Sequence, residues 1–252
     1  MLPELHMICY SNCLNNSVSI AAFLFTASQG RKDLNLLPLK TTETKSIDNI
    51  LKGCKFIPES TTTKKVLEEF FAQLAQSNHK EVVFHFSGHA RPDWVPQNEI
   101  PTNYGLTGCL VLDVAKTNHT QSSFITASDE TVIDNILETE HSVPINSTED
   151  IDDTLLFARE IRKMDLTKVR LAILNACNTF KAPVASKSSH TGLTRAFLAA
   201  GAQCVIATLD KVADYVANKF TEYLYQNLHE KGLTIGDAFA DAINQIRTDR
   251  YT

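Results

Sequence analysis

The feature that most constrains the fold of this chain is an alternation between short apolar runs and longer stretches with a helical period. Short continuous apolar runs are typical of strands buried on both faces of a sheet, and helical stretches between them supply the crossovers that parallel strands need. The alternation therefore predicts an α/β domain with a mainly parallel central sheet. At 252 residues the chain is long enough for such a sheet, and we expect one domain over residues 1–252.

The predicted elements follow from this pattern and from the residues that bound each run. The predicted strands are mostly flanked by polar residues or glycine and cover 6–10, 55–58, 82–86, 109–112, 169–174 and 202–208. The predicted helices cover 62–71, 153–164, 191–200, 213–230 and 234–246. Threonines at the start of the first helix can cap it, and Gly201 and Gly232 stand where helix C-caps are expected.

The overall charge argues against one class of ligand. The formal net charge is −5 and the sequence pI is about 5.9, so the chain offers no strongly basic surface to neutralise phosphates. We therefore expect no nucleic acid among its partners. The N-terminal residues lack a basic flank followed by an apolar stretch, and no apolar run reaches membrane length, so we expect a cytoplasmic protein without a membrane contact.

The cysteines indicate a reducing compartment. They are scattered through apolar segments without the dense spacing of a disulfide scaffold: Cys9, Cys13, Cys54, Cys109, Cys177 and Cys204. Cys9 and Cys13 form the only close pair, and no neighbouring histidine or cysteine pair completes a zinc site. We expect no metal and no cofactor.

One segment departs from the rest in composition. Residues 121–153 contain nine acidic residues and no lysine or arginine, so the remainder of the chain is net positive. Such a run is usually a solvated loop. Val132, Ile133, Ile136 and Leu137 nevertheless fall at helical spacing, which is also the pattern of a docking or occluding element. We treat residues 121–153 as an acidic insertion in the domain.

Two predicted strands end in residues that can do chemistry. The apolar run 82–86 continues into Ser87, Gly88 and His89, and the run 169–174 continues through Asn175 and Ala176 to Cys177. In open α/β sheets, ligands bind beyond the carboxyl ends of parallel strands, where these two side chains can face one another. A core role remains the ordinary interpretation for His85, inside its strand, and for the other cysteines.

A cysteine and a histidine at one sheet edge match the needs of acyl transfer. A thiolate attacks a peptide carbonyl, an imidazole returns a proton to the leaving amine, and backbone N–H groups receive the developing oxyanion. We also predict that the pKa of Cys177 is lower than that of an ordinary thiol.

The segments around these residues resemble a known family. His85–His89, Leu174–Thr179, the run 192–209 and the closing stretch 234–242 occur in the order and spacing of CHAT domains, relatives of caspases, separases and gingipains. The resemblance covers roughly residues 34–247, with the acidic segment as an insertion. It implies a caspase-like α/β/α sandwich and a cysteine endopeptidase that cleaves a specific protein substrate in a regulated signalling or defence pathway.

The resemblance also implies roles for individual residues. His89 would be the general acid/base and Cys177 the nucleophile, with an oxyanion hole made by the backbone N–H groups of Cys177 and Ala90. The family usually has glycine at the place of Ala90, and a methyl group there costs energy if the backbone requires a positive φ. Many members carry tryptophan at the place of Asp210, near the substrate pocket of caspase relatives.

These departures lead to a prediction about specificity. Asp210, with Asp214 one helical turn beyond it, would put carboxylates in the pocket for the side chain before the scissile bond, and so select lysine or arginine. The alternative for Asp210 is an ordinary turn residue.

Two other functions compete with the peptidase. A catalytically idle caspase-like module would act only as a scaffold or interaction part, although a scaffold needs neither His89 nor Cys177. A flavodoxin-like nucleotide or signal receiver could use a similar sheet, but the sequence has no G-x-G-x-x-G and no phosphate loop. An activating or regulatory protein partner is expected, because CHAT domains often sit beside sensor modules.

Overall fold

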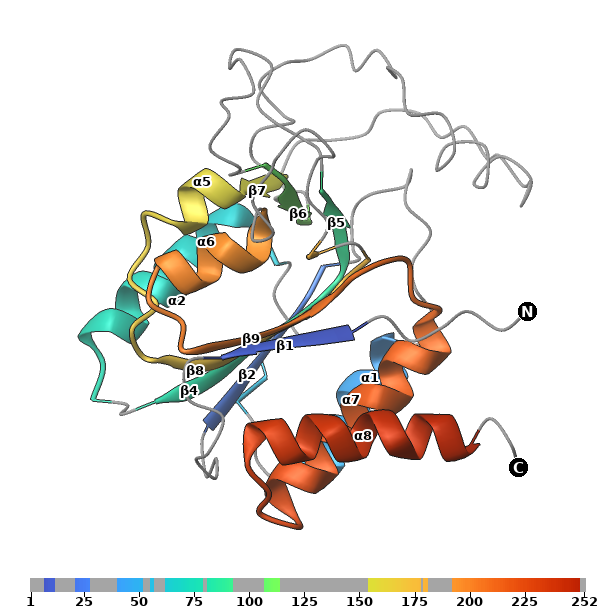
Figure 1. The fold of residues 1–252 in the computed structure, drawn as a ribbon. Coiled ribbons are helices and arrows are strands. Elements are labelled where there is room, and N and C mark those ends of the chain that lie inside the picture. Colours follow the sequence, from blue (N-terminus) through green and yellow to red (C-terminus); the bar gives the residue numbers. More distant parts are fainter. Residues whose placement is uncertain are drawn as a thin grey trace, which may run out of the picture.

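Strands from both halves of the chain assemble into one six-stranded sheet in the structure of the protein, a computed structural model (Figure 1). From one edge to the other the strands are β1 (Met7–Ser11), β9 (Cys204–Thr208), β8 (Val169–Asn175), β4 (Val82–Ser87), β2 (Ala21–Thr26) and β3 (Lys55–Phe56). β1 pairs with β9 in the antiparallel sense, and the other neighbours pair in parallel. The prediction of a mainly parallel sheet is confirmed.

The structure describes residues 7–11, 21–27, 40–51, 55–56, 62–78, 81–92, 107–113, 154–177, 179–180 and 192–249. All residues of the acidic insertion, 121–153, lie outside the described residues, and so do Cys13 and Cys54.

Helices cover both faces of the sheet, as Figure 1 shows. On one face lie α2 (Lys64–Gln76), α5 (Ala158–Ile161) and α6 (Leu193–Ala199), and on the other lie α1 (Lys40–Leu51), α7 (Asp214–His229) and α8 (Ile235–Asp249). The buried apolar residues form two large clusters, one under each helix layer. This arrangement is the predicted α/β/α sandwich.

Strand β4 shows why the central strands are mainly apolar. Phe84 and Phe86 belong to the cluster beneath α2, whereas Val83 belongs to the cluster beneath α1 and α7. His85 is also buried, on the same face as Val83 because side chains alternate along a strand. Buried faces on both sides leave no solvent-exposed position in β4, and this explains its mainly apolar sequence.

A second, smaller sheet extends from the end of β4. Strand β5 (His89–Arg91) pairs with β6 (Cys109–Val111), and β6 pairs with β7 (Leu155–Phe157), both in the antiparallel sense. The predicted helix over 153–164 is therefore wrong in its first part. Leu155, Leu156 and Phe157 form β7, which pairs with β6 and packs one face against the main core and the other against a small apolar cluster, and the helical part is confined to α5.

The remaining predicted elements agree with the structure within a few residues, and three further elements were not predicted, namely α1, β2 and β5. Thr63 caps α2 by accepting a hydrogen bond from the Val66 N–H at 3.3 Å, as its position indicated. Gly201 ends α6 with a φ of 109° and lies against Thr167, where a Cβ would come within 2.9 Å of that side chain. Glycine is therefore needed at this C-cap.

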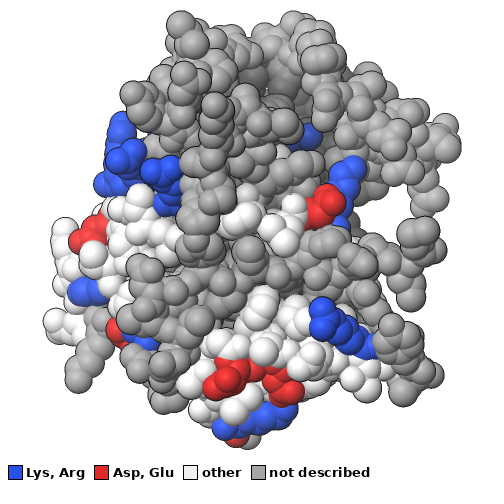
Figure 2. Space-filling model, in the orientation of Figure 1, with Lys and Arg blue, Asp and Glu red and all other residues white. Residues whose placement is uncertain are grey.

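Charged side chains are interspersed on the described surface. Figure 2 shows small separate groups of basic and acidic residues, and neither sign forms a continuous field over the described part of this face. Among the described residues, no helix combines the length and apolar character needed to cross a bilayer. Cys109 and Cys204 are buried free thiols, in agreement with their interpretation as core residues.

Candidate catalytic site

The ends of β4 and β8 lie side by side at the carboxyl edge of the sheet. The last residues of the two strands, Ser87 and Asn175, are register partners, and the Gly88 N–H donates a 3.1 Å hydrogen bond to the Asn175 carbonyl oxygen. His89 and Cys177 each follow two residues after these partners. The backbones that lead into the two predicted catalytic residues are therefore neighbours.

Gly88 allows the chain to pass from β4 into β5. A Cβ on Gly88 would come within 2.5 Å of the Phe86 ring, which is fully buried in the core. Any side chain at this position would displace that ring or the turn. Beyond Gly88, His89 is half-buried and begins β5, opposite Val111 of β6. The small sheet thus fixes the backbone that carries His89.

A pair of buried threonines holds the turn that carries Cys177. The Thr208 N–H donates to Thr179 Oγ1 at 2.9 Å, and the Phe180 N–H donates to the Thr208 carbonyl oxygen at 2.9 Å. The Thr208 hydroxyl also donates to the Ala176 carbonyl oxygen. These contacts connect the residues on both sides of Cys177 to the end of β9. In the sequence, Thr179 stood out only as the end of the Leu174–Thr179 segment, and nothing indicated the role of Thr208.

The thiol of Cys177 is half-buried and points toward the segment before α7. Its Sγ lies 3.9 Å from the Val212 carbonyl oxygen, within reach of a weak S–H hydrogen bond. Burial raises the pKa of this thiol, and the carboxylates of Asp214 and Asp210 add to the effect, while Val212 and Lys211 oppose it. The prediction of a lowered pKa is therefore wrong for this structure, because desolvation and negative charge both disfavour the thiolate.

Both predicted substrate-binding carboxylates act electrostatically on Cys177, so both lie in its neighbourhood. Asp210 is exposed, and its Oδ1 accepts a 2.8 Å hydrogen bond from the Lys211 N–H, a contact typical of a turn residue. Asp214 is the first residue of α7 and is half-buried. The two carboxylates thus flank the segment whose carbonyl contacts the thiol.

Ala90 lies in β5, where it pairs with Leu110 of β6. A strand residue has an extended backbone that alanine adopts without the cost of a positive φ. The replacement of glycine by alanine therefore brings no left-handed strain at this position.

A profile of the CHAT domain family matches residues 12–252. The chain belongs to the CHAT domain family. A search of curated proteins gave no match. The family match confirms the resemblance seen in the sequence, and the α/β/α sandwich is that of a caspase-like fold. CHAT domains as a family are associated with caspase-like cysteine peptidases.

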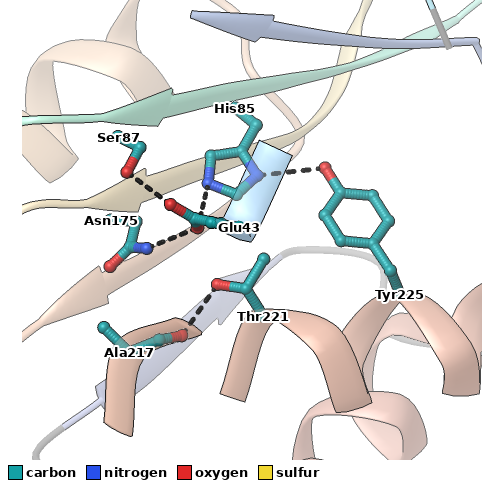
Figure 3. Close-up of polar contacts among 7 residues, drawn as sticks. All are labelled: Glu43, His85, Ser87, Asn175, Ala217, Thr221 and Tyr225. Carbon is teal, nitrogen blue, oxygen red and sulfur yellow. Dashed lines mark hydrogen bonds and ion pairs between the residues drawn. The ribbon is translucent and has the colours of Figure 1, made fainter. Parts of the chain in front are cut away.

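This CHAT domain also contains a buried polar network that the sequence analysis missed. Glu43 of α1 lies beneath the ends of β4 and β8, where it contacts Ser87, Asn175 and His85 (Figure 3). His85 Nδ1 in turn lies 3.2 Å from the Tyr225 hydroxyl of α7. The interpretation of His85 as a buried, hydrogen-bonded core residue is confirmed. The sequence signal for the network was weak, because its members lie far apart along the chain.

Proposed function

We propose that this protein is a cysteine endopeptidase in which Cys177 is the nucleophile and His89 the general acid/base. The observation that carries the proposal is the register of β4 and β8, since each catalytic candidate follows two residues after a paired strand end. The carboxyl edge of a parallel sheet is also where substrates bind in α/β proteins. The family membership agrees with this chemistry.

The proposed reaction has two stages. The sulfur of Cys177 bonds to the scissile carbonyl carbon as its proton passes to His89, and the oxyanion receives hydrogen bonds from the N–H groups of Cys177 and Ala90. The C–N bond then breaks, and His89 gives its proton to the leaving amine. Water, deprotonated by His89, hydrolyses the thioester and releases the thiol.

The proposed substrate is a protein with lysine or arginine before the scissile bond. Asp210 and Asp214 lie near Cys177, and their carboxylates supply negative charge where a cationic side chain would be received. Asp214, which is half-buried, is the stronger candidate of the two, because charges screened less by solvent discriminate more.

The catalytic pair is tested by substitution. Cys177→Ala and His89→Ala should each abolish cleavage while the domain remains folded, and the double variant should be no worse than either single one. Cys204→Ala, which changes a buried thiol of β9, serves as the matched control and should keep the activity. Cleavage of substrate by the folded Cys177→Ala protein would contradict the assignment.

The specificity is tested with a panel of fluorogenic peptides that differ in the residue before the bond. We expect wild type to prefer lysine or arginine, and Asp214→Ala and Asp210→Ala to weaken this preference. Asp241→Ala removes a carboxylate that instead pairs with Lys231, beyond the far end of α7, and should leave the preference unchanged. A preference for apolar or acidic residues would exclude the basic pocket.

One observation favours a second candidate, an idle caspase-like scaffold. The raised pKa of Cys177 leaves it mainly as the less nucleophilic thiol near neutral pH. Labelling with a peptide carrying a thiol-reactive group separates the two functions. A peptidase accelerates labelling of Cys177 well above the rate for a small alkylating agent such as iodoacetamide, whereas an idle fold does not.

A further inference from the structure

Glu43 receives polar contacts from both strands that lead into the catalytic pair. Ser87 Oγ donates to its Oε2 at 2.7 Å, and Asn175 Nδ2 donates to its Oε1 at 2.7 Å. His85 Nε2 lies 3.4 Å from Oε1, long for a hydrogen bond and short enough for an ion pair. Figure 3 shows these three side chains directed at one carboxylate. All four side chains are buried.

The position of these contacts links them to the proposed reaction. Ser87 and Asn175 are the last residues of β4 and β8, and they are partners in the register. Each stands two residues before a catalytic candidate, His89 or Cys177. A group bound to both Ser87 and Asn175 therefore holds the two points from which the catalytic segments leave the sheet.

A carboxylate fits this place because it accepts hydrogen bonds at both oxygens and donates none. Burial alone would raise the pKa of Glu43, but His85, Ser87 and Asn175 outweigh it and hold the pKa below its ordinary value. Glu43 is thus a charged, hydrogen-bonded group beneath the site rather than a member of it.

We propose that Glu43 is a positioning residue, which binds the ends of β4 and β8 and so sets the separation of His89 from Cys177. This inference rests on the proposed function for its catalytic consequence. Its structural part concerns only the two strand ends, and it can be tested without any substrate.

The loss of Glu43 should loosen the last backbone contacts between the strands. Without the carboxylate, the Ser87 hydroxyl and the Asn175 amide lose the acceptor that they share, and the buried space admits water or the side chains rotate. The backbone hydrogen bonds nearest to them run from the Gly88 N–H to Asn175 and from the Ala27 N–H to Ser87. Exchange of these two amide protons with solvent reports the opening of the strand ends.

The experiment compares Glu43→Ala with Glu43→Gln. The alanine variant should lose protection at the Gly88 and Ala27 amides, and Cys177 should react about 10²-fold more slowly with a peptidyl acyloxymethyl ketone, the size of effect that misplaced catalytic groups produce. The glutamine variant should keep most of the amide protection and most of the Cys177 labelling rate of the wild-type protein. Its carbonyl oxygen can accept from Asn175, and its amide can donate to Ser87, since a hydroxyl also accepts hydrogen bonds.

Asn227→Ala is the matched control, since Asn227 is a buried polar residue whose Nδ2 donates to the Ala238 carbonyl oxygen at 3.1 Å, between α7 and α8. It should lower stability without changing Gly88 protection or Cys177 labelling. Ser87→Ala removes one contact to Glu43, and it should lower Gly88 protection and Cys177 labelling by less than Glu43→Ala does. If Glu43→Ala does not fold, the Ser87→Ala protein provides the test.

The outcomes separate this inference from the proposed function. Wild-type protection at Gly88 in a folded Glu43→Ala protein would overturn the positioning role. Lost protection with unchanged labelling would overturn its catalytic consequence. Absence of accelerated labelling in the wild-type protein would contradict the proposed function instead, and amide exchange would still decide whether Glu43 holds the strand ends.

Discussion

The two faces of the central sheet differ in the chemistry of what they bury. The face under α2 and α6 is filled with aromatic rings that contact one another: Phe23, Phe25, Phe70, Phe71, Phe84 and Phe197. The face under α1 and α7 combines aliphatic residues with buried polar groups, including Glu43, His85 and Tyr225. One strand, β4, contributes to both faces through alternate residues.

The two faces therefore contribute differently: one mainly to the stability of the fold, and the other to the position of the strand ends. Apolar contacts are non-directional, so the aromatic face stabilises the fold without specifying the position of one strand end relative to another. Hydrogen bonds are directional, so the polar face can specify such a position at the cost of burying charge. We therefore expect changes on the aromatic face to affect mainly stability, and changes on the polar face to affect mainly the site.

The largest effect should come from Phe84→Ala on the aromatic face. Phe84 is fully buried, and its ring centroid lies 5.0 Å from that of Phe71 and 5.6 Å from that of Phe197. The substitution should lower the free energy of unfolding by about 3–5 kcal/mol, measured by urea denaturation. The folded fraction should label at Cys177 at the wild-type rate, and a large fall in that rate would break the division between the faces.

An intermediate effect should come from the charge of Glu43. Glu43→Gln replaces charge-assisted hydrogen bonds by neutral ones and should cost about 1–3 kcal/mol at neutral pH. Because the folded pKa of Glu43 is below its ordinary value of 4.5, the wild-type advantage is complete above that value and is lost as the pH falls through the folded pKa. Urea denaturation of both proteins against pH checks this. A difference independent of pH would contradict the ionised carboxylate.

The smallest effect should come from Tyr225→Phe, which removes only the hydroxyl that contacts His85 Nδ1. We expect a loss of about 0.5–1.5 kcal/mol in the free energy of unfolding, since the ring stays in its packed place. Cys177 labelling should fall less than twofold, because Glu43 keeps its contacts to both strand ends. A loss of labelling as large as that of Glu43→Ala would extend the positioning role to α7.

The sequence predicted the sheet and the catalytic candidates because both depend on local pattern. β4 and β8 are mainly apolar, and His89 and Cys177 follow two residues after their ends, so one rule about parallel strands places both at one edge. Asp210 and Asp214 were also singled out from the sequence, and the structure brings both near Cys177.

The polar face could not be predicted for a physical reason. Glu43 lies in a helix rich in threonine, a residue of low helix propensity, so the segment has no strong local helical signal. Packing of α1 against α7 and the sheet stabilises it instead. The contacts of Glu43 span 44 residues to Ser87 and 132 to Asn175, and no local pattern records such pairs. The thiol pKa was predicted wrongly because the sequence does not reveal burial.

The antiparallel strand β1 has a consequence for how the chain acquires its fold during synthesis. β1 is the first described strand to leave the ribosome, and its partner β9 comprises residues 204–208. The chain must therefore be translated beyond residue 208 before β1 can pair with β9, and until then the backbone donors and acceptors of β1 are open to other strands. Closing so distant a pair costs chain entropy, which makes the docking of β1 a natural late step of folding.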